Sequence, residues 1–179
     1  MRAEYGQQIP VRVEVLTEEN RKFCKDFFCG NPAIDDYFRF EALDDASAVT
    51  YLIIDDDRQK LLAALTVSCS AIFLSKRQQL STLLSAMEVV YFAVDVNYQG
   101  MRYRPGDGRS MSHYLFSYLI EMLRGISRNN VGAAKIVLYS VPEAENFYRR
   151  LGFVPFQISM YGDRGTYVRG CVPMYFDLN

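Results

Sequence analysis

The sequence has few of the residues that hold metal ions or build common hydrolytic centres. Histidine occurs once, at His113, and the four cysteines include no Cys-x-x-Cys pair. A zinc site needs several such ligands at close spacing, so we expect no bound metal. A Ser-His-Asp triad would have to use His113, and no Gly-x-Ser-x-Gly segment accompanies it. We interpret Cys24, Cys29, Cys69 and Cys171 as reduced thiols, mostly buried.

Long apolar runs are also missing. No stretch approaches the roughly 20 residues that a membrane-spanning helix needs. The first residues lack the apolar segment of a secretory signal, which predicts a cytoplasmic location. A dense Lys/Arg run, the mark of a dedicated nucleic-acid surface, is missing as well.

The chain contains enough apolar residues for a real core. It has 179 residues, of which 50% are hydrophobic and 14% aromatic, and we expect a single globular domain over residues 1–179. The net charge of −1 hides an asymmetry: residues 1–57 carry 6 basic and 13 acidic side chains, and residues 102–169 carry 10 basic and 5 acidic ones. A basic C-terminal half suits a phosphate-bearing ligand, although ordinary surface charge explains it as well.

Hydrophobic periodicity predicts the element order β-α-α-β-β-β-α-β-α-β-β. Strand–helix alternation in the middle of the chain predicts at least one parallel strand pair. We expect strands at 11–15, 49–54, 61–69, 87–94, 135–139, 153–161 and 166–176, helices at 17–27, after residue 32, at 110–128 and around residue 148, and a loop or short helix at 75–85.

The segment 144–153 reads Ala-Glu-Asn-Phe-Tyr-Arg-Arg-Leu-Gly-Phe. Pro142 before it and Gly152 near its end predict a short helix that turns directly into a strand. Tyr148 lies beside the apolar face of that helix, where it either points into a cleft or packs as a half-buried core residue. The pattern Ala-x-x-Phe-Tyr-x-x-x-Gly-Phe resembles the last conserved helix of the GNAT superfamily of N-acetyltransferases.

Two further segments carry the resemblance. Residues 92–100, Phe-Ala-Val-Asp-Val-Asn-Tyr-Gln-Gly, resemble the central GNAT strand running into its pyrophosphate loop. Residues 28–37, Phe-Cys-Gly-Asn-Pro-Ala-Ile-Asp-Asp-Tyr, are similar to a GNAT subgroup that includes toxins of toxin–antitoxin pairs. A glycine break followed by an asparagine helix cap explains that second segment without any function.

The resemblance implies an α/β (α+β) fold. It has a mixed, mostly antiparallel twisted sheet of six or seven strands, helices on both faces and a splayed parallel pair in the centre. It also implies acetyl-CoA as co-substrate, with the pantetheine arm held by the backbone of Phe92, Ala93 and Val94. Tyr148 would act as general acid on the departing thiolate. Glu88 resembles the frequent general base of the family, although a solvated or arginine-paired strand residue is the simpler interpretation.

The expected pyrophosphate loop departs from the family pattern (Arg/Gln)-x-x-Gly-x-(Gly/Ala). Arg102 stands where the first glycine belongs, and a Gly-x-Gly follows later, just before Ser110. Either the loop carries an insertion that rebuilds the phosphate cradle, or it has lost the geometry for coenzyme A. The first alternative gives a cofactor-binding set of Phe92, Ala93, Val94, Gln99, Arg102, Arg104, Gly106, Gly108, Arg109, Ser110 and Asn146. Asp107 in the cradle favours the second alternative because it would repel a pyrophosphate, whereas three arginines within eight residues favour the first.

Three functions follow from this resemblance. The first is transfer of an acetyl group from acetyl-CoA to a primary amine of a small molecule, peptide or protein. The second is a toxin-like acetyltransferase that acts on aminoacyl-tRNA and is paired with an antitoxin; the missing basic run argues against it. The third is a non-catalytic GNAT-fold binding protein. The resemblance also implies a possible homodimer.

Overall fold

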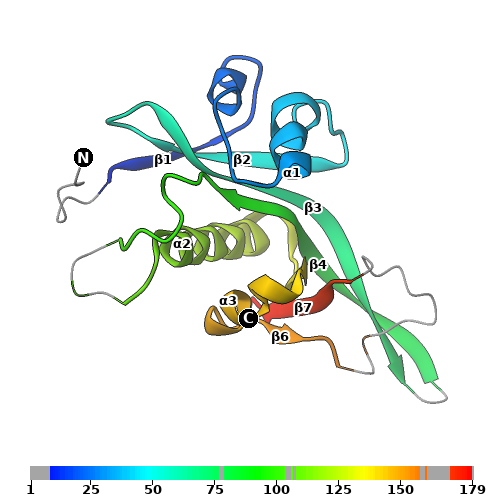
Figure 1. Ribbon diagram of the computed structural model, residues 1–179. Helices are drawn as coiled ribbons and strands as arrows, with labels where there is room; N and C mark the ends of the chain where they lie inside the picture. Colours follow the sequence, from blue (N-terminus) through cyan, green and yellow to red (C-terminus); the bar gives the residue numbers. More distant parts are fainter. Residues whose placement is uncertain are drawn as a thin grey trace. The chain divides into compact units, whose positions relative to one another are not determined.

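The computed structural model describes residues 9–76, 79–103, 106, 108–157, 160 and 170–178. Within these residues, seven strands form one sheet in the order β1-β2-β3-β4-β5-β7-β6 (Figure 1). The strands are β1 (Val11–Val15), β2 (Ala48–Asp55), β3 (Lys60–Lys76), β4 (Gln79–Val94), β5 (Lys135–Ser140), β6 (Val154–Pro155) and β7 (Val172–Asp177). The helical elements are η1 (Arg21–Cys24), α1 (Pro32–Asp36), η2 (Tyr37–Glu41), α2 (Met111–Ile126), η3 (Ser127–Val131), η4 (Pro142–Ala144) and α3 (Glu145–Arg150).

The sheet mixes antiparallel and parallel neighbours. The pairs β1–β2, β5–β7 and β6–β7 are antiparallel. The pair β4–β5 is parallel, with a register that runs from Ala86 opposite Lys135 to Val89 opposite Leu138. These pairings confirm the predicted mixed, mostly antiparallel sheet and its parallel pair.

The chain packs as two compact units, which we describe separately. Unit 1 comprises Met1–Val67 and Tyr91–Tyr118, and unit 2 comprises Ser68–Val90 and Leu119–Asn179. Strands β3 and β4 and helix α2 each contribute residues to both units. The single domain over 1–179 stays a prediction.

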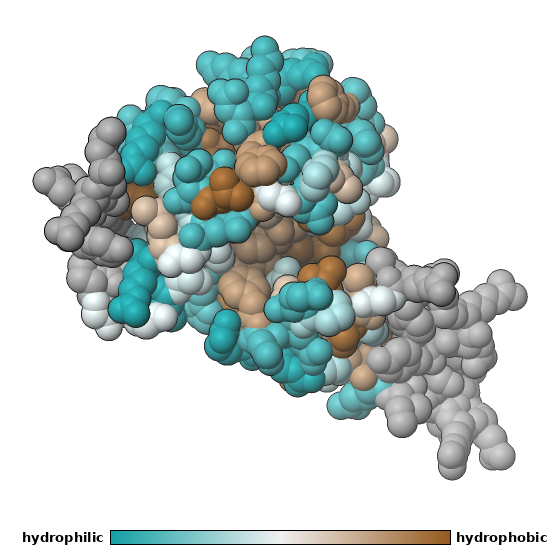
Figure 2. Space-filling model, in the orientation of Figure 1, coloured by the Kyte–Doolittle hydropathy of each residue, from teal (hydrophilic) through white to brown (hydrophobic). Residues whose placement is uncertain are grey.

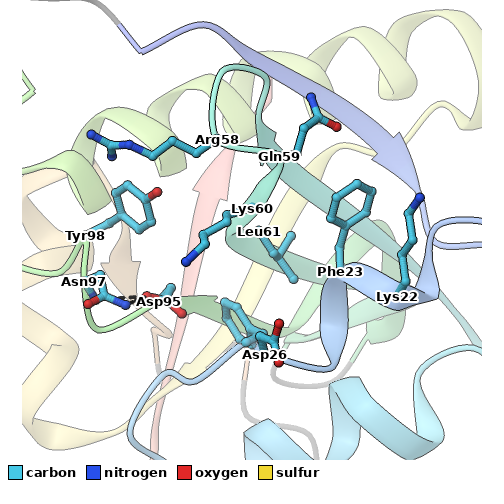
Figure 3. A pocket seen from close by; sticks show the side chains of 11 residues that line it. Lys22, Phe23, Asp26, Arg58, Gln59, Lys60, Leu61, Asp95, Asn97 and Tyr98 are labelled. Carbon is cyan, nitrogen blue, oxygen red and sulfur yellow. Dashed lines mark hydrogen bonds between the residues drawn. The ribbon is translucent and has the colours of Figure 1, made fainter.

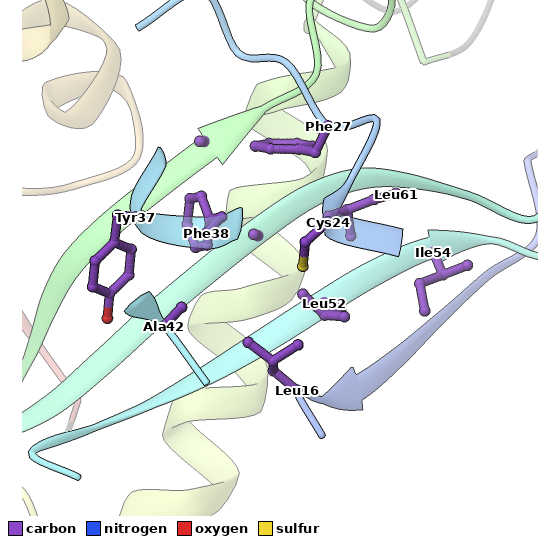
Figure 4. Packing of buried hydrophobic residues seen from close by; sticks show 11 residues of the cluster. Leu16, Cys24, Phe27, Tyr37, Phe38, Ala42, Leu52, Ile54 and Leu61 are labelled. Atoms are coloured by element: carbon purple, nitrogen blue, oxygen red, sulfur yellow. The ribbon is translucent and has the colours of Figure 1, made fainter. Parts of the chain in front are cut away.

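The core of unit 1 lies between short helical elements and the sheet (Figure 4). Cys24 of η1 and Phe38 of η2 are buried in one cluster with Leu52 and Ile54 of β2. Leu52 and Ile54 are two residues apart, so they share one face of the strand. Over η1 and α1 the surface is mostly hydrophilic (Figure 2), which gives these short elements one apolar and one polar side.

Helical elements cover both faces of the sheet in unit 1. The ring of Tyr91 in β4 lies 4.4 Å from the ring of Tyr37 in η2. The ring of the next residue, Phe92, lies 4.7 Å from the ring of Phe116 in α2. Successive side chains of a strand point to opposite faces, so η2 and α2 lie on opposite sides of β4. This arrangement agrees with the layers that the resemblance implies.

Unit 2 has a core of its own, and it explains one wrong prediction. Residues 75–76 and 79–85 are strand and not a loop or a short helix, because β3 extends to Lys76 and β4 begins at Gln79; residues 77–78 lie outside the described residues. Ile72 and Ala86 are buried in the cluster of unit 2, and Leu84 packs against it. Leu84 and Ala86 keep the period of two that a half-buried strand requires, which the many serines of this segment obscured.

The predicted helix over 17–27 is also wrong, since only the 3-10 turn η1 forms there. The side chain of Asn20 accepts a hydrogen bond from the Thr17 N–H and donates one to the Val15 carbonyl, which closes a turn where the helix should start. The two C-terminal strands are shorter than predicted, as β6 and β7, and residues 158–159 and 161–169 lie outside the described residues. No helix among the described residues has the length and apolar character to cross a membrane.

Candidate functional site

The end of β4 directs backbone groups away from β3. The N–H of Asp95, the residue after the strand, donates to the Leu62 carbonyl of β3 at 2.8 Å. Backbone groups of successive strand residues point to opposite edges, so Phe92 and Val94 direct theirs to the edge opposite β3. The parallel register with β5 has already ended at Val89, five residues before the end of β4. We call the backbone groups of Phe92 and Val94 the β4 edge.

This alternation of backbone direction separates the three residues that are predicted to hold the pantetheine arm into two groups. The backbone of Ala93 points to the β3 side, together with Asp95, whereas Phe92 and Val94 form the β4 edge. The Val94 carbonyl is already engaged, because the side-chain amide of Gln99 donates to it at 2.7 Å. Phe92 and the N–H of Val94 therefore lie on the edge opposite β3, and the backbone of Ala93 does not; their contact with a pantetheine arm stays a prediction.

The loop between β4 and α2 is closed at its base. The Met111 N–H donates to the Met101 carbonyl at 2.6 Å, and Arg102 and Ser110 form an isolated antiparallel bridge. Arg102 and Ser110 are thus held together next to the first turn of α2. That the loop carries an insertion which rebuilds the phosphate cradle stays a prediction.

The first turn of α2 already uses some of the groups that would bind a phosphate. Ser110 caps the helix, because its Oγ accepts a hydrogen bond from the His113 N–H at 3.3 Å. The Met111 N–H is also bonded, as described above. Both amides belong to the set that attracts an anion at a helix N-terminus, so a pyrophosphate would have to compete for them.

The predicted glycines and arginines of the loop differ in their surroundings. Gly106 has a φ of +82°, whereas Gly108 is not in the left-handed region, and a Cβ on either would meet nothing within 4 Å. Arg102 and Arg109 are exposed. Arg104 and Asp107, of which the first was predicted to bind phosphate and the second to repel it, lie outside the described residues.

The Cys-Gly-Asn segment acts as a helix start. The Asn31 side chain accepts hydrogen bonds from the N–H groups of Ala33 at 3.1 Å and Ile34 at 3.5 Å. Gly30 has a φ of +90°, which glycine adopts without strain. The glycine break and asparagine cap foreseen from the sequence are both present.

Tyr148 lies in unit 2, on α3. The helix follows the 3-10 turn that begins at Pro142, and Gly152 leaves it with a φ of +94°, as predicted. The Tyr148 ring lies 5.9 Å from the ring of Phe153 in an edge contact. The side chain is half-buried, and burial raises the pKa of Tyr148 to about 12. Asn146, predicted to contact the pantetheine arm, is exposed.

Glu88 is a half-buried residue within β4 and not at its start. Its Oε2 accepts a hydrogen bond from the Ser70 hydroxyl of β3 at 3.0 Å. Its backbone lies opposite Val137 of β5, inside the parallel register. The carboxylate is thus neither fully solvated nor paired with an arginine among the described residues.

The predicted site residues fall into two groups. Unit 1 contains those of the β4 edge and of the loop to α2, and unit 2 contains Glu88, Asn146 and Tyr148. Within unit 1 the structure adds a connection that sequence reasoning missed. Gln99 bonds the Cys29 carbonyl at 2.8 Å, so two of the three segments that resemble GNAT motifs are in direct contact. A glutamine side chain bridging 70 residues of sequence leaves no local pattern to read.

A separate cleft of about 850 Å³ lies in unit 1 beside the start of the loop (Figure 3). Lys60 projects into it near Asp95 and Asn97, with Lys22 and Phe23 on the other side. The lining carries three cationic and two carboxylate side chains, so charge alone does not select one class of ligand. Sequence patterns do not predict this cleft, because its lining residues come from three separate segments without a shared motif.

Comparison with known proteins finds likeness in structure only. No protein-family model matches the sequence, and no curated protein matches it significantly. A solved bacterial toxin has a TM-score of 0.68 at 21% identity, covering 94% of this chain and 91% of its own. A Tyr→Phe mutant of the AtaT toxin has a TM-score of 0.70 at 15% identity, covering 99% and 94%. A Tyr→Phe mutant of KacT has a TM-score of 0.69 at 16% identity, covering 96% of both chains.

These likenesses establish that the chain has the GNAT fold, in the form seen in bacterial toxins. AtaT has been solved with acetyl-CoA and the C-terminus of the antitoxin AtaR. It has also been solved in complex with acetyl-methionyl-tRNAfMet.

Proposed function

We propose that this protein is an N-acetyltransferase that moves the acetyl group of acetyl-CoA to a primary amine. The observation that carries the proposal is the β4 edge, which lies beyond the parallel register with β5 and leads through a closed loop to the start of α2. Such an edge presents backbone groups to the amide-rich pantetheine arm. A helix N-terminus favours the negative charge of a pyrophosphate. The GNAT fold shared with AtaT, which has been solved with acetyl-CoA, supports the assignment.

The chemistry needs few groups. The amine must lose a proton before it attacks the thioester carbonyl, and the thiolate must gain one as the C–S bond breaks. We assign the first role to Glu88, directly or through water, and the second to Tyr148. With its pKa raised to about 12, the Tyr148 hydroxyl keeps its proton at neutral pH and remains able to donate it. A backbone N–H of the β4 edge would polarise the thioester carbonyl.

Aminoacyl-tRNA is the second candidate for the acceptor. It is supported by the fold shared with AtaT, which has been solved with acetyl-methionyl-tRNAfMet. A partner antitoxin belongs to the same candidate, because AtaT has also been solved with part of AtaR. The net charge of −1 and the missing basic run oppose it, since tRNA binding depends on phosphate contacts.

Calorimetric titration with acetyl-CoA tests the donor. We expect a dissociation constant of about 1 μM to 1 mM, the range of most Michaelis constants. If millimolar acetyl-CoA produces neither heat nor a thermal shift, the enzyme assignment is wrong. The non-catalytic GNAT-fold binding protein is then the better interpretation.

A free-thiol assay then identifies the acceptor. Small amines, peptides and aminoacyl-tRNA are compared under identical conditions, with deacylated tRNA as the matched control. Release of coenzyme A with aminoacyl-tRNA alone would select the toxin-like function. That release should also fall steeply with added salt, because binding to RNA displaces counterions. Release with small amines alone would exclude it.

A further inference from the structure

Gln99 makes two hydrogen bonds that join distant parts of unit 1. Its side-chain amide donates to the Val94 carbonyl at 2.7 Å and to the Cys29 carbonyl at 2.8 Å. Both hydrogens of one amide group are therefore used. One acceptor is the last residue of β4, and the other is the residue before the Gly30 break.

Asp95 adds to the junction between the end of β4 and residues 28–30, which we call the junction below. Its Oδ2 accepts a hydrogen bond from the Phe28 N–H at 3.3 Å, and the Phe28 carbonyl accepts one from the Val96 N–H at 2.9 Å. Asp95 is 6% exposed, so its carboxylate is largely shielded from water. A Cβ added to Gly30 would lie 3.6 Å from the side chain of Val96, so the two segments run close together.

The junction lies directly at the β4 edge. Val94 belongs to that edge, and the chain leaves the strand there for the loop that leads to α2. On the edge opposite β3 the described register with β5 ends at Val89, so side-chain contacts such as those of Gln99 help to set the direction of the last residues of β4. Gln99 thus holds the Val94 carbonyl, which lies on the same edge of β4 as the Val94 N–H.

We propose that Gln99 is a positioning residue for the acetyl-CoA donor, which it serves by holding the β4 edge against the 28–30 segment. This inference rests on the proposed function, but it changes the role that the loop pattern gives Gln99. Its amide holds the protein's own carbonyls and does not contact the cofactor. In this proposal the Cys-Gly-Asn segment is the part of unit 1 to which the end of β4 is tied, through the bond from Gln99 to the Cys29 carbonyl.

Kinetics of three variants test the positioning role. Gln99→Leu keeps the size of the side chain but has no donor, and we expect it to raise the KM for acetyl-CoA about tenfold, the loss expected for one or two hydrogen bonds. We expect kcat to stay within about twofold, because the reacting groups are untouched. Gln99→Arg, whose guanidinium offers several N–H donors in a fork, should restore most of the affinity. Gln157→Leu makes the same change at an exposed site and should leave both constants unchanged.

A lower KM for acetyl-CoA in Gln99→Leu would overturn the proposal. If the Gln99 amide merely occupies a carbonyl that the donor needs, Gln99→Leu will lower the KM for acetyl-CoA. An unchanged KM would equally exclude a positioning role.

Hydrogen exchange tests the junction independently of any cofactor. In Gln99→Leu, the amides of Phe28 and Val96 should exchange faster, because both belong to the junction. The Leu16 amide, bonded to the Thr50 carbonyl at 2.8 Å, serves as the reference within unit 1. Unchanged exchange at Phe28 and Val96 refutes the junction even if acetyl-CoA binds. Faster exchange in a protein that binds no acetyl-CoA would refute the proposed function and the donor role, while confirming the junction.

Discussion

Thr50 and Thr66 place their hydroxyl oxygens 2.8 Å apart across the neighbouring strands β2 and β3. Both side chains are buried, with exposed fractions of 3% and 0%. The core of unit 1 thus contains a small buried polar network, formed by these two hydroxyls, that links β2 to β3.

This relationship predicts strong coupling between the two threonines. Thr66→Val removes one hydroxyl and leaves the Thr50 hydroxyl short of a partner, so we expect a loss of about 1–3 kcal/mol in the free energy of unfolding. The double variant Thr50→Val/Thr66→Val should lose less than the sum of the single variants, with a coupling of about 0.5–3 kcal/mol. Urea unfolding measures all three. The exposed Thr82→Val is the control, and strictly additive losses would contradict the network.

Gly152 carries a second prediction about stability. It has a φ of +94°, and a Cβ there would lie 3.2 Å from Cε2 of Phe176. Gly152→Ala should therefore destabilise the protein by about 1–3 kcal/mol, through backbone strain and close contact. Gly125→Ala is the matched control: that glycine lies inside α2, with nothing within 4 Å of an added Cβ. There we expect a gain of up to about 1 kcal/mol in thermal unfolding experiments, because alanine favours a helix. Equal effects at both positions would contradict this account.

The parts of the fold that the sequence predicts well have strong local signals. Val11, Val13 and Val15 alternate with polar residues, and β1 forms over those bounds. Gly152 marks the end of α3 because few other residues adopt its φ without strain. The prediction fails at residues 75–85, where a long two-stranded hairpin is specified by the packing of Ile72 and Ala86 in unit 2.

The candidate site could be predicted only in part, for a similar reason. Resemblance in residues 92–100 pointed to the end of β4 and the loop, and the structure shows how the backbone there is directed. It could not reveal that Gln99 binds the Cys29 carbonyl, because the two residues are 70 positions apart in the sequence and meet only in the folded unit 1. The same holds for Ser70 beside Glu88, which meet only through the pairing of β3 and β4.

The cysteines correct one expectation and permit a further test. They are free thiols, but only Cys24 is buried, and Cys69 is exposed. Burial raises the pKa of Cys24 and of Cys29 to about 11, so their thiolate fractions at pH 8 are on the order of one in a thousand.

Iodoacetamide at pH 8 should therefore label Cys69 first and leave Cys24 and Cys29 largely unmodified, as read by peptide mass spectrometry. Raising the pH toward 10 should speed the reaction of the half-buried Cys29, because its thiolate fraction grows. Equal labelling of Cys29 and Cys69 at pH 8 would contradict the environment described for Cys29.

Tyr148 carries the most direct test of the proposed chemistry. Tyr148→Phe removes the proton that the thiolate would take, so kcat should fall by about 10²–10⁴, the usual contribution of a general acid. The KM for acetyl-CoA should hardly change. Tyr118→Phe, at an exposed position of α2, is the control and should keep full turnover.

The pH dependence follows from the raised pKa of Tyr148. Because the folded value of about 12 exceeds the ordinary 10, the protonated hydroxyl contributes stability that is present below pH 10 and lost as the pH rises toward 12. Turnover should accordingly show no loss caused by Tyr148 between pH 6 and 10, and Tyr148→Phe should weaken the fall in stability above pH 10. Rate profiles and thermal unfolding at matched pH measure both. Unchanged turnover in Tyr148→Phe would remove this residue from the mechanism and leave the thiolate to be protonated by water.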